Sequence, residues 1–359
     1  MNFEKIIILL TFFIFLAAFI ITNHLFISES ADLSLVSDVK YISNEIGPRP
    51  AGSENEKEAS QYLASKLNSY GVETEIDEFK YYSMRSESFK QSENVVGTIK
   101  GISSQQIVIC ADLDSVKDKS NGNYTEGTND DVTGLAILIG LAKKYQNEKP
   151  YFTIKLIGFG AGEDEYTTPV NVSQITSLNP DEYNEIMSIP YLVGARYYVL
   201  QNQDSINDTV AVISLEAVGS GDPCFIAQDS FIYNNQSFVD FLVSNARING
   251  FNAQKVDFMT YNSSSGDESP ISHIYLPFSY ANIPATFLTC MENPNVNDLV
   301  HGDAEMPGYL TVNDNYENLV KNNGGEAKLQ RHLDEILFLT KDSINKLSIF
   351  YALKSSSNA

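Results

Sequence analysis

The chain has no tryptophan, three cysteines and four histidines among its 359 residues. Three thiols cannot form the disulfide framework of a small secreted scaffold, so the fold has to rest on a hydrophobic core. Positive charge is also scarce, because 24 Lys and Arg face 46 Asp and Glu, for a formal net charge of −22. Such an acidic chain repels nucleic acids and anionic lipids, so neither is an expected partner. Its 43% of hydrophobic residues can bury a large core.

The three cysteines are Cys110, Cys224 and Cys290. Cys110 lies in the apolar run 107–111, which predicts that it is a small buried residue. Only one disulfide can form among three thiols. The sequence leaves open whether Cys224 and Cys290 form it.

Residues 6–22 form an apolar run that is interrupted only by Thr11 before it ends at Thr22. These 17 residues are at the lower limit for a bilayer span and slightly long for a signal-peptide core. Lys5 precedes the run, and no Lys or Arg follows until Lys40, which orients the rest of the chain outward. No small-residue cleavage site follows directly, so an uncleaved anchor is favoured over a secretion signal. We expect residues 1–31 to be this segment and 32–359 one external domain, which contacts the membrane only through the anchor.

Five Asn-x-Ser/Thr sequons agree with an external, glycosylated domain. They begin at Asn123, Asn171, Asn207, Asn235 and Asn262, all in polar stretches typical of loops or helix starts. Such sequons also arise by chance in a chain rich in Asn and Ser. Their support for the location is therefore secondary to that of the apolar run.

Strand-like and helix-like segments alternate along the rest of the chain. The patterns predict helices over 31–46, 54–70, 131–145, 237–248 and 326–352, and strands over 73–79, 94–99, 107–111, 152–159, 209–215 and 285–290. Continuous apolar runs are typical of strands that are covered on both faces. The alternation predicts a doubly wound α/β/α sandwich with a mostly parallel, mixed central sheet. Functional sites in such sheets lie at the carboxyl ends of the strands.

Acidic clusters occur where strands of this sheet end or a helix begins. They are Asp112 with Asp114, Asp130 with Asp131, Glu163 with Asp164 and Glu165, and Glu216. One Asp after a strand is usually a helix cap. Several carboxylates at one edge repel one another unless protons or cations compensate, so a metal site is the simplest explanation. His301 could complete it, and an acidic pocket that binds no ion firmly is the alternative.

Short motifs occur in a fixed order between residues 48 and 319. They are Arg49-Pro-Ala-Gly-Ser53, Asn94-Val-Val-Gly97, Gly127-Thr-Asn-Asp-Asp-Val-Thr-Gly134, Ser214-Leu-Glu-Ala-Val-Gly219, Ile283-Pro-Ala285 and, after His301, Asp314-Asn-Tyr-Glu-Asn-Leu319. Together they resemble the co-catalytic zinc exopeptidases of clan MH, which include aminopeptidase Y, aminopeptidase S and the glutaminyl cyclases. The resemblance implies a zinc-exopeptidase fold, a peptide or protein substrate and two metal ions that activate water.

The resemblance also implies a ligand set. The metal-bridging Asp falls on Asp130, with Asp131 next to it in a supporting role, and the other ligand positions fall on Asp112, Glu163, Glu216 and His301. Asp112 replaces a family His that Asp114 would orient. Either a metal holds Asp112, or the two acids share a proton. Zinc is implied by the resemblance, but a carboxylate-rich set also suits Ca²⁺, Mn²⁺ or Mg²⁺, with one or two ions bound.

The general-base position departs further from the family pattern. Relatives have Glu-Glu after Phe-x-Ala, where the first Glu is the base and the second a ligand. Here Phe159-Gly-Ala-Gly-Glu163 puts Gly162 at the base position. Glycine cannot accept a proton, and loss of a general base costs about 10²–10⁴ in rate. An alignment slipped by one residue would make Glu163 the base and Asp164 the ligand.

Three functions follow from these patterns. The first is a metal-dependent exopeptidase, most plausibly an aminopeptidase, and the second a catalytically inactive ectodomain that binds peptides or partner proteins. The third is cyclisation of an N-terminal glutamine. Residues 164–192 look inserted next to the site and form either a lid over it or an inert surface loop. Oligomeric state and side-chain preference have no signal in the sequence.

Overall fold

The computed structural model describes residues 35–118, 120–163, 167–170, 180–189, 191–228, 236–258, 273–291 and 310–357. Within these ranges no helix is both long and apolar enough to cross a membrane. The predicted segment 1–31 and three of the sequons lie outside them. The other two sequon asparagines, Asn123 and Asn207, are both exposed.

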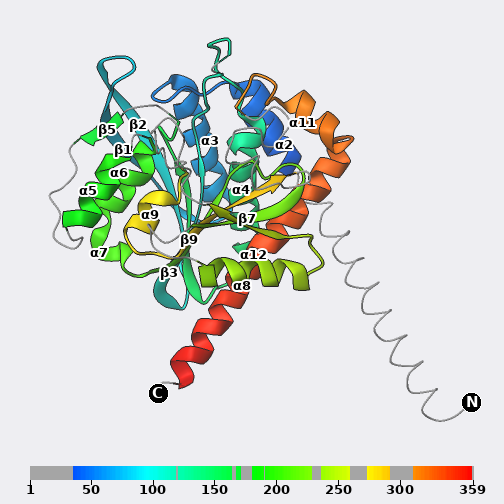
Figure 1. Ribbon diagram of the computed structural model, residues 1–359. Helices are drawn as coiled ribbons and strands as arrows, with labels where there is room; N and C mark the ends of the chain where they lie inside the picture. The colour runs from blue at the N-terminus through cyan, green and yellow to red at the C-terminus, as the bar shows by residue number, and fades with distance from the viewer. Residues whose placement is uncertain are drawn as a thin grey trace, which may run out of the picture.

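A nine-stranded mixed sheet forms the centre of the domain (Figure 1). Its strands are β1 (Glu73–Ser83), β2 (Ser88–Ile99), β3 (Ser103–Asp112), β4 (Phe152–Phe159), β5 (Thr167–Val170), β6 (Thr209–Leu215), β7 (Asp222–Gln228), β8 (Gln254–Phe258) and β9 (Ala285–Met291). Their order is β5-β1-β2-β4-β3-β6-β9-β7-β8. The four strands β4, β3, β6 and β9 are parallel, whereas β2 and β7 flank them in antiparallel pairs. The predicted α/β fold is confirmed, with its parallel core at the centre.

Helices cover both faces of this sheet. They are α2 (Leu35–Lys40), which continues into a π-helical turn over Tyr41–Ile46, α3 (Glu54–Ser69), α4 (Thr133–Tyr145), α5 (Pro180–Ser188), α6 (Val193–Gln201), α7 (Gln203–Ile206), α8 (Gln236–Ile248), α9 (Leu276–Tyr280), α11 (Tyr316–Asn323) and α12 (Glu326–Ser357). One core lies between the sheet and α2, α3, α4, α8 and α12, and the other beneath α5, α6 and α9. Side chains of β3 alternate between the cores, with Ile107 and Ile109 in the first and Val108 in the second. This two-sided burial explains the continuous apolar run in the sequence.

The two predicted strands 73–79 and 94–99 are halves of a longer hairpin. β1 and β2 pair in antiparallel register from Glu73 with Thr98 to Ser83 with Ser88. In the outer half, β1 alternates between buried Phe79 and Tyr81 and exposed Lys80, but residues 88–91 of β2 are mostly polar and exposed, and both predicted strands stop short of this half. β5 and β8, which form the two edges of the sheet, and β7, which lies between β9 and β8, were not predicted either.

The inserted residues 164–192 contribute to the core where the structure describes them. β5 pairs with β1 at the edge of the sheet, and α5 follows it. Ile186, Ile189 and Leu192 are buried in the second core. The alternative of an inert surface loop is therefore wrong for this part of the insertion.

All three cysteines are buried free thiols. Cys224 lies opposite Thr289, and Cys290 lies opposite Pro223, in the antiparallel pair of β7 and β9. This one-residue offset turns the two thiols to opposite faces of the sheet, into different cores. A disulfide between them is excluded by that geometry.

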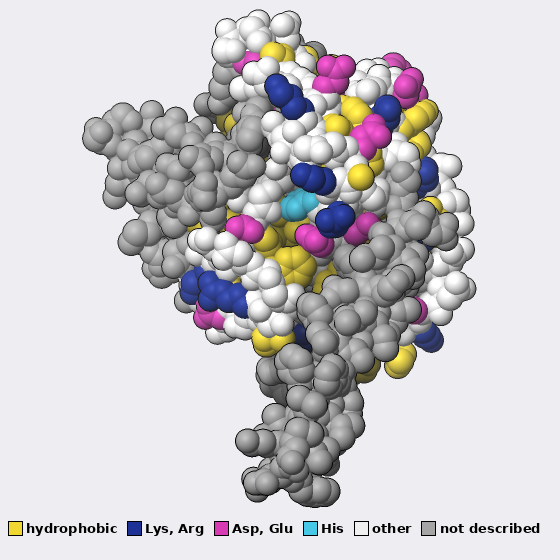
Figure 2. Space-filling view, turned by 90° about the vertical axis from the view of Figure 1, so that its right-hand side faces the viewer, with side chains coloured by type: hydrophobic (Ala, Val, Ile, Leu, Met, Phe, Trp, Pro, Cys, Tyr) yellow, Lys and Arg dark blue, Asp and Glu magenta, His cyan; other side chains and the backbone are white. Residues whose placement is uncertain are grey.

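The surface charge is mixed on the face that Figure 2 shows. Lys and Arg side chains there lie interspersed with Asp and Glu. Several acids that contribute to the net charge are buried instead, at the carboxyl edge of the parallel strands.

Helix α4 approaches β6 closely enough to require glycine. A Cβ on Gly134 would lie 2.4 Å from the carbonyl oxygen of Leu215, whereas one on Gly140 would meet only the ends of leucine side chains at 2.9–3.2 Å. We expect Gly134→Ala to lower the free energy of unfolding by about 1–3 kcal/mol, because backbone cannot yield as a side chain can. Gly140→Ala is the matched control and should cost less, since alanine favours a helix. Urea denaturation measures both, and equal costs would contradict this account.

Candidate active site

The parallel strands bring the predicted acids to one edge of the sheet. Cys110 of β3 pairs with Ser214 of β6, so Asp112 and Glu216 each lie two residues beyond paired positions on neighbouring strands. Asp130 precedes α4, and Glu163 follows β4. The exposed fractions of Asp112, Asp130 and Glu216 are only 4%, 8% and 7%, which makes this edge a buried acidic cluster.

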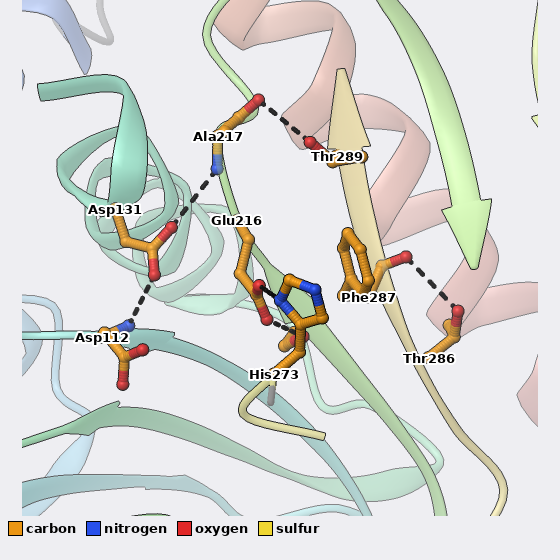
Figure 3. A network of polar contacts seen from close by, with 9 residues as sticks. Asp112, Asp131, Glu216, Ala217, His273, Thr286, Phe287 and Thr289 are labelled. Carbon is orange, nitrogen blue, oxygen red and sulfur yellow. Dashed lines mark hydrogen bonds and ion pairs between the residues drawn. The ribbon is translucent and has the colours of Figure 1, made fainter. Parts of the chain in front are cut away.

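Asp131 ties two of these strands together (Figure 3). Its carboxylate accepts hydrogen bonds from the backbone N–H groups of Asp112 and Ala217, both at 3.3 Å. The peptide bond between Asp130 and Asp131 is cis. Asp314 holds this loop from the other side, because it accepts from the N–H groups of Asn129 at 2.7 Å and Asp130 at 3.1 Å. The sequence analysis placed Asp314 in a motif but assigned it no role.

Side chains fix the loop that follows β4. The backbone N–H groups of residues 160–163 donate, in chain order, to Asn94 Oδ1, Glu56 Oε1, Asp114 Oδ1 and Asp114 Oδ2, at 3.2, 2.8, 2.8 and 3.0 Å. Glu56 also accepts from Gly52 N at 2.7 Å and Ser92 Oγ at 2.9 Å. Each N–H of residues 160–163 is therefore held by a polar side chain, which sets the position of Glu163.

Gly162 and Asp112 occupy mutually dependent positions. A Cβ on Gly162 would lie 2.3 Å from Oδ1 of Asp112 and 2.6 Å from Oδ2. The carboxylate of Asp112 thus fills the space into which any side chain at position 162 would extend. Oδ1 of Asp112 is buried and has no hydrogen-bond partner.

Burial and mutual repulsion keep these carboxyls protonated to higher pH than usual. Burial, then the charges of Asp114 and Glu163, raise the pKa of Asp112 well above its ordinary value. Burial and the charge of Asp131 do the same for the pKa of Asp130, and burial and the charge of Glu216 do so for the pKa of Asp131. A bound cation would offset this repulsion.

Arg49 is the buried cation beneath the cluster. It is fully buried and donates to the carbonyl oxygens of Leu113 at 2.8 Å, Gly47 at 2.9 Å and Glu126 at 2.6 Å. Burial lowers its pKa to about 10, against the attraction of acids such as Asp114. Arg49 therefore links the end of β3 to the loop that carries Asp130.

His273 joins the cluster, although the sequence analysis assigned it no role. Its Nδ1 is hydrogen-bonded to Oε2 of Glu216, and Ser214 Oγ donates to Oε1 of the same carboxylate at 2.8 Å (Figure 3). The ring lies against Phe287, with centroids 4.1 Å apart. Two features of the sequence could have drawn attention to His273: it is one of only four histidines, and it lies ten residues before Ile283.

The side chains of the acidic cluster have the chemistry of a divalent-cation site. The cluster combines buried carboxylates, raised pKa values and one unpartnered oxygen on Asp112. In the described ranges, however, no three His, Cys, Asp or Glu side chains are already grouped so as to hold an ion. His301 and Asp164, both named as ligand positions, lie outside those ranges. Asp112, Asp130, Glu163 and Glu216 are the described predicted residues that could hold the metal.

Sequence comparison identifies the family. The profile described as Peptidase family M28 matches residues 94–330, and the chain belongs to this family. This supports a peptidase-type function. Comparison with curated protein sequences gives no match.

Solved structures share the fold. A Bacteroides thetaiotaomicron glutaminyl cyclase bound to N-acetylhistamine has 17% identity and a TM-score of 0.61, with 87% of this chain and 98% of that chain covered. A Zn-dependent exopeptidase from Parabacteroides distasonis has 20% identity, a TM-score of 0.60 and coverages of 88% and 98%. The zinc aminopeptidase BSAP from Bacillus subtilis has 13% identity and a TM-score of 0.58, with 86% of this chain and 94% of that chain covered.

The contact between Gly162 and Asp112 predicts a coupling between two substitutions. Gly162→Ala should lower the free energy of unfolding by about 1–3 kcal/mol, because its Cβ collides with the Asp112 carboxylate. In an Asp112→Ala background the same change should cost less than about 1 kcal/mol. A double-mutant cycle by urea denaturation measures the difference. The same cost in both backgrounds would show that Asp112 does not fill this space.

The buried acids predict a stability that falls as pH rises. Burial raises the pKa of Asp314 to about 7 and, with Asp114, that of Glu56 to about 8. The native state therefore binds more protons than the unfolded state above about pH 4, and stability is lost as pH rises toward 8. The slope is about 1.4 kcal/mol per pH unit for each extra bound proton.

Denaturation of the metal-free protein between pH 5 and 8 measures this slope. Glu56→Gln removes one of the titrating groups and should flatten the slope between about pH 6 and 8. Asp118→Asn is the control, since hydrogen bonds hold the pKa of Asp118 near 2, outside the window. Stability that increases from pH 5 to 8 would contradict the assignment.

Proposed function

We propose that this protein is a metal-dependent exopeptidase of the aminopeptidase type, acting on peptide or protein substrates outside the cytoplasm. The observation that carries the proposal is the meeting of Asp112, Asp130, Glu163 and Glu216 at one strand edge, in a chain of Peptidase family M28. A metal bound there would polarise the scissile carbonyl and activate a water molecule. Cleavage at the amino end rests on the aminopeptidases among the structural neighbours.

Different residues of the chain would hold the metal, position the strand ends and accept a proton. Asp130 and Glu216 would hold the metal, with Glu163, which the anchored loop positions, and His301 as further ligands. Asp131 keeps the ends of β3 and β6 at a fixed spacing. Glu163 acts as the base only if the alignment slips by one residue, and otherwise Gly162 leaves the site without one and lowers the rate by about 10²–10⁴.

The location of the activity depends on the first residues of the chain. With residues 1–31 as an uncleaved anchor, the domain would face outward on a single-pass membrane protein. Cleavage of this segment would make it a secreted, glycosylated enzyme. The exposure of Asn123 and Asn207 is compatible with either arrangement.

A second candidate is a catalytically inactive ectodomain that binds peptides or partner proteins. The packing at position 162 favours it, because Asp112 fills the space that a base at this position would need. Cyclisation of glutamine is a weaker candidate, since it too needs a proton-transfer group at the metal.

Turnover of aminoacyl-nitroanilides by the purified full-length protein tests the proposal. We expect hydrolysis that needs added Zn²⁺ or Mn²⁺ and is abolished by a chelator. Asp130→Asn should lower kcat/KM by at least about 10²-fold, because the bridging position loses its charge. Asp118→Asn, in a loop outside the cluster, is the control and should keep its activity. No turnover with Zn²⁺, Mn²⁺ or Ca²⁺ in a folded protein would favour the inactive ectodomain.

A further inference from the structure

We propose that His273 replaces the imidazole missing at position 112 and ligates a divalent metal ion together with Glu216. The inference rests on the metal dependence of the proposed function. It adds a ligand from the segment before α9, a part of the chain that the ligand set predicted from the sequence did not use.

The position of the ring is the first argument. Nδ1 of His273 lies on the carboxylate of Glu216, on the side of the ring that faces Asp131 and Asp112 (Figure 3). Nitrogen and carboxylate oxygen are therefore adjacent at the end of β6. Imidazole nitrogen with carboxylate oxygens is a common donor set for zinc and other transition metals.

The second argument is that the ring is held in place. Phe287 on β9 contacts the imidazole, and Tyr275 stacks parallel to it at a centroid distance of 6.4 Å. The side chains of His273 and Glu216 are only 12% and 9% exposed. Ser214 fixes the other oxygen of Glu216, so both donors lose little freedom when an ion binds.

The third observation is that further carboxylates lie beside the His273–Glu216 pair, where a cation would offset their repulsion. The negative charge of Glu216 acts on both Asp112 and Asp130, and the buried Oδ1 of Asp112 has no hydrogen-bond partner. Asp112 and Asp130 would be further donors for an ion at the His273–Glu216 pair. Ligation through Nδ1 requires that the ring proton lie on Nε2.

The register of β3 and β6 explains how an imidazole at position 112 or at position 273 can reach the same metal ion. Asp112 and Glu216 end neighbouring parallel strands at the same level, so an ion near one is near the other. Relatives that this chain resembles provide the imidazole from β3, at position 112. Here Asp112 lies against Gly162, and His273 approaches Glu216 from the side of β9.

Metal binding by the full-length protein tests the proposal without relying on activity. Zn²⁺ affinity would be measured by calorimetry, and the visible spectrum of bound Co²⁺ would report nitrogen ligation. We expect His273→Phe, which keeps an aromatic ring against Phe287, to weaken Zn²⁺ binding at least about 10–100-fold and to change the Co²⁺ spectrum. His332→Gln is the matched control, because it removes an imidazole of α12 that is hydrogen-bonded to the Val218 carbonyl instead of a carboxylate.

A rescue experiment separates ligation from packing. Asp112→His in the His273→Phe background returns an imidazole to β3 and should recover at least part of the lost Zn²⁺ affinity. Unchanged affinity and spectrum in His273→Phe would overturn the proposal, and so would equal losses in His332→Gln. Peptidase activity is scored separately, so tight His273-dependent binding without turnover would refute the proposed function while leaving the ligand assignment intact.

Discussion

The structure depends on placing several carboxylates at one buried edge without a matching number of cations. Parallel strands that end at the same level leave no choice about where Asp112 and Glu216 lie. Their repulsion is offset mainly by backbone N–H groups, which donate to Asp114, Asp131 and Asp314, and by one buried guanidinium, that of Arg49. The loops around this edge therefore place their backbone N–H groups where these donate hydrogen bonds to the acids.

That constraint links two departures that look independent along the sequence. An imidazole at position 112 and a glutamate at position 162 are both missing relative to the clan MH pattern. In the fold the two positions touch, and the Asp112 carboxylate takes the space beside Gly162. In this chain, a side chain at position 162 would therefore require the Asp112 carboxylate to move. The pair behaves as one remodelled part of the site rather than as two losses.

Much of the fold was predictable because the central strands are buried on both faces and read as unbroken apolar runs. The outer half of the β1–β2 hairpin was not, because residues 88–91 of β2 are mostly polar and exposed and give little strand signal. The acids at the strand ends were predictable from motif order. His273 was not, since nothing in its local sequence distinguishes a histidine that contacts Glu216 from one on the surface.

By itself, the sequence determined the parallel α/β core, the family and the acidic residues at the strand ends, because strong local patterns encode each of them. Only the tertiary structure decided that Cys224 and Cys290 face different cores, that Asp112 closes off position 162, and that His273 lies on Glu216. These facts depend on contacts between residues separated by 50 or more positions along the chain, and local propensity carries no information about such contacts.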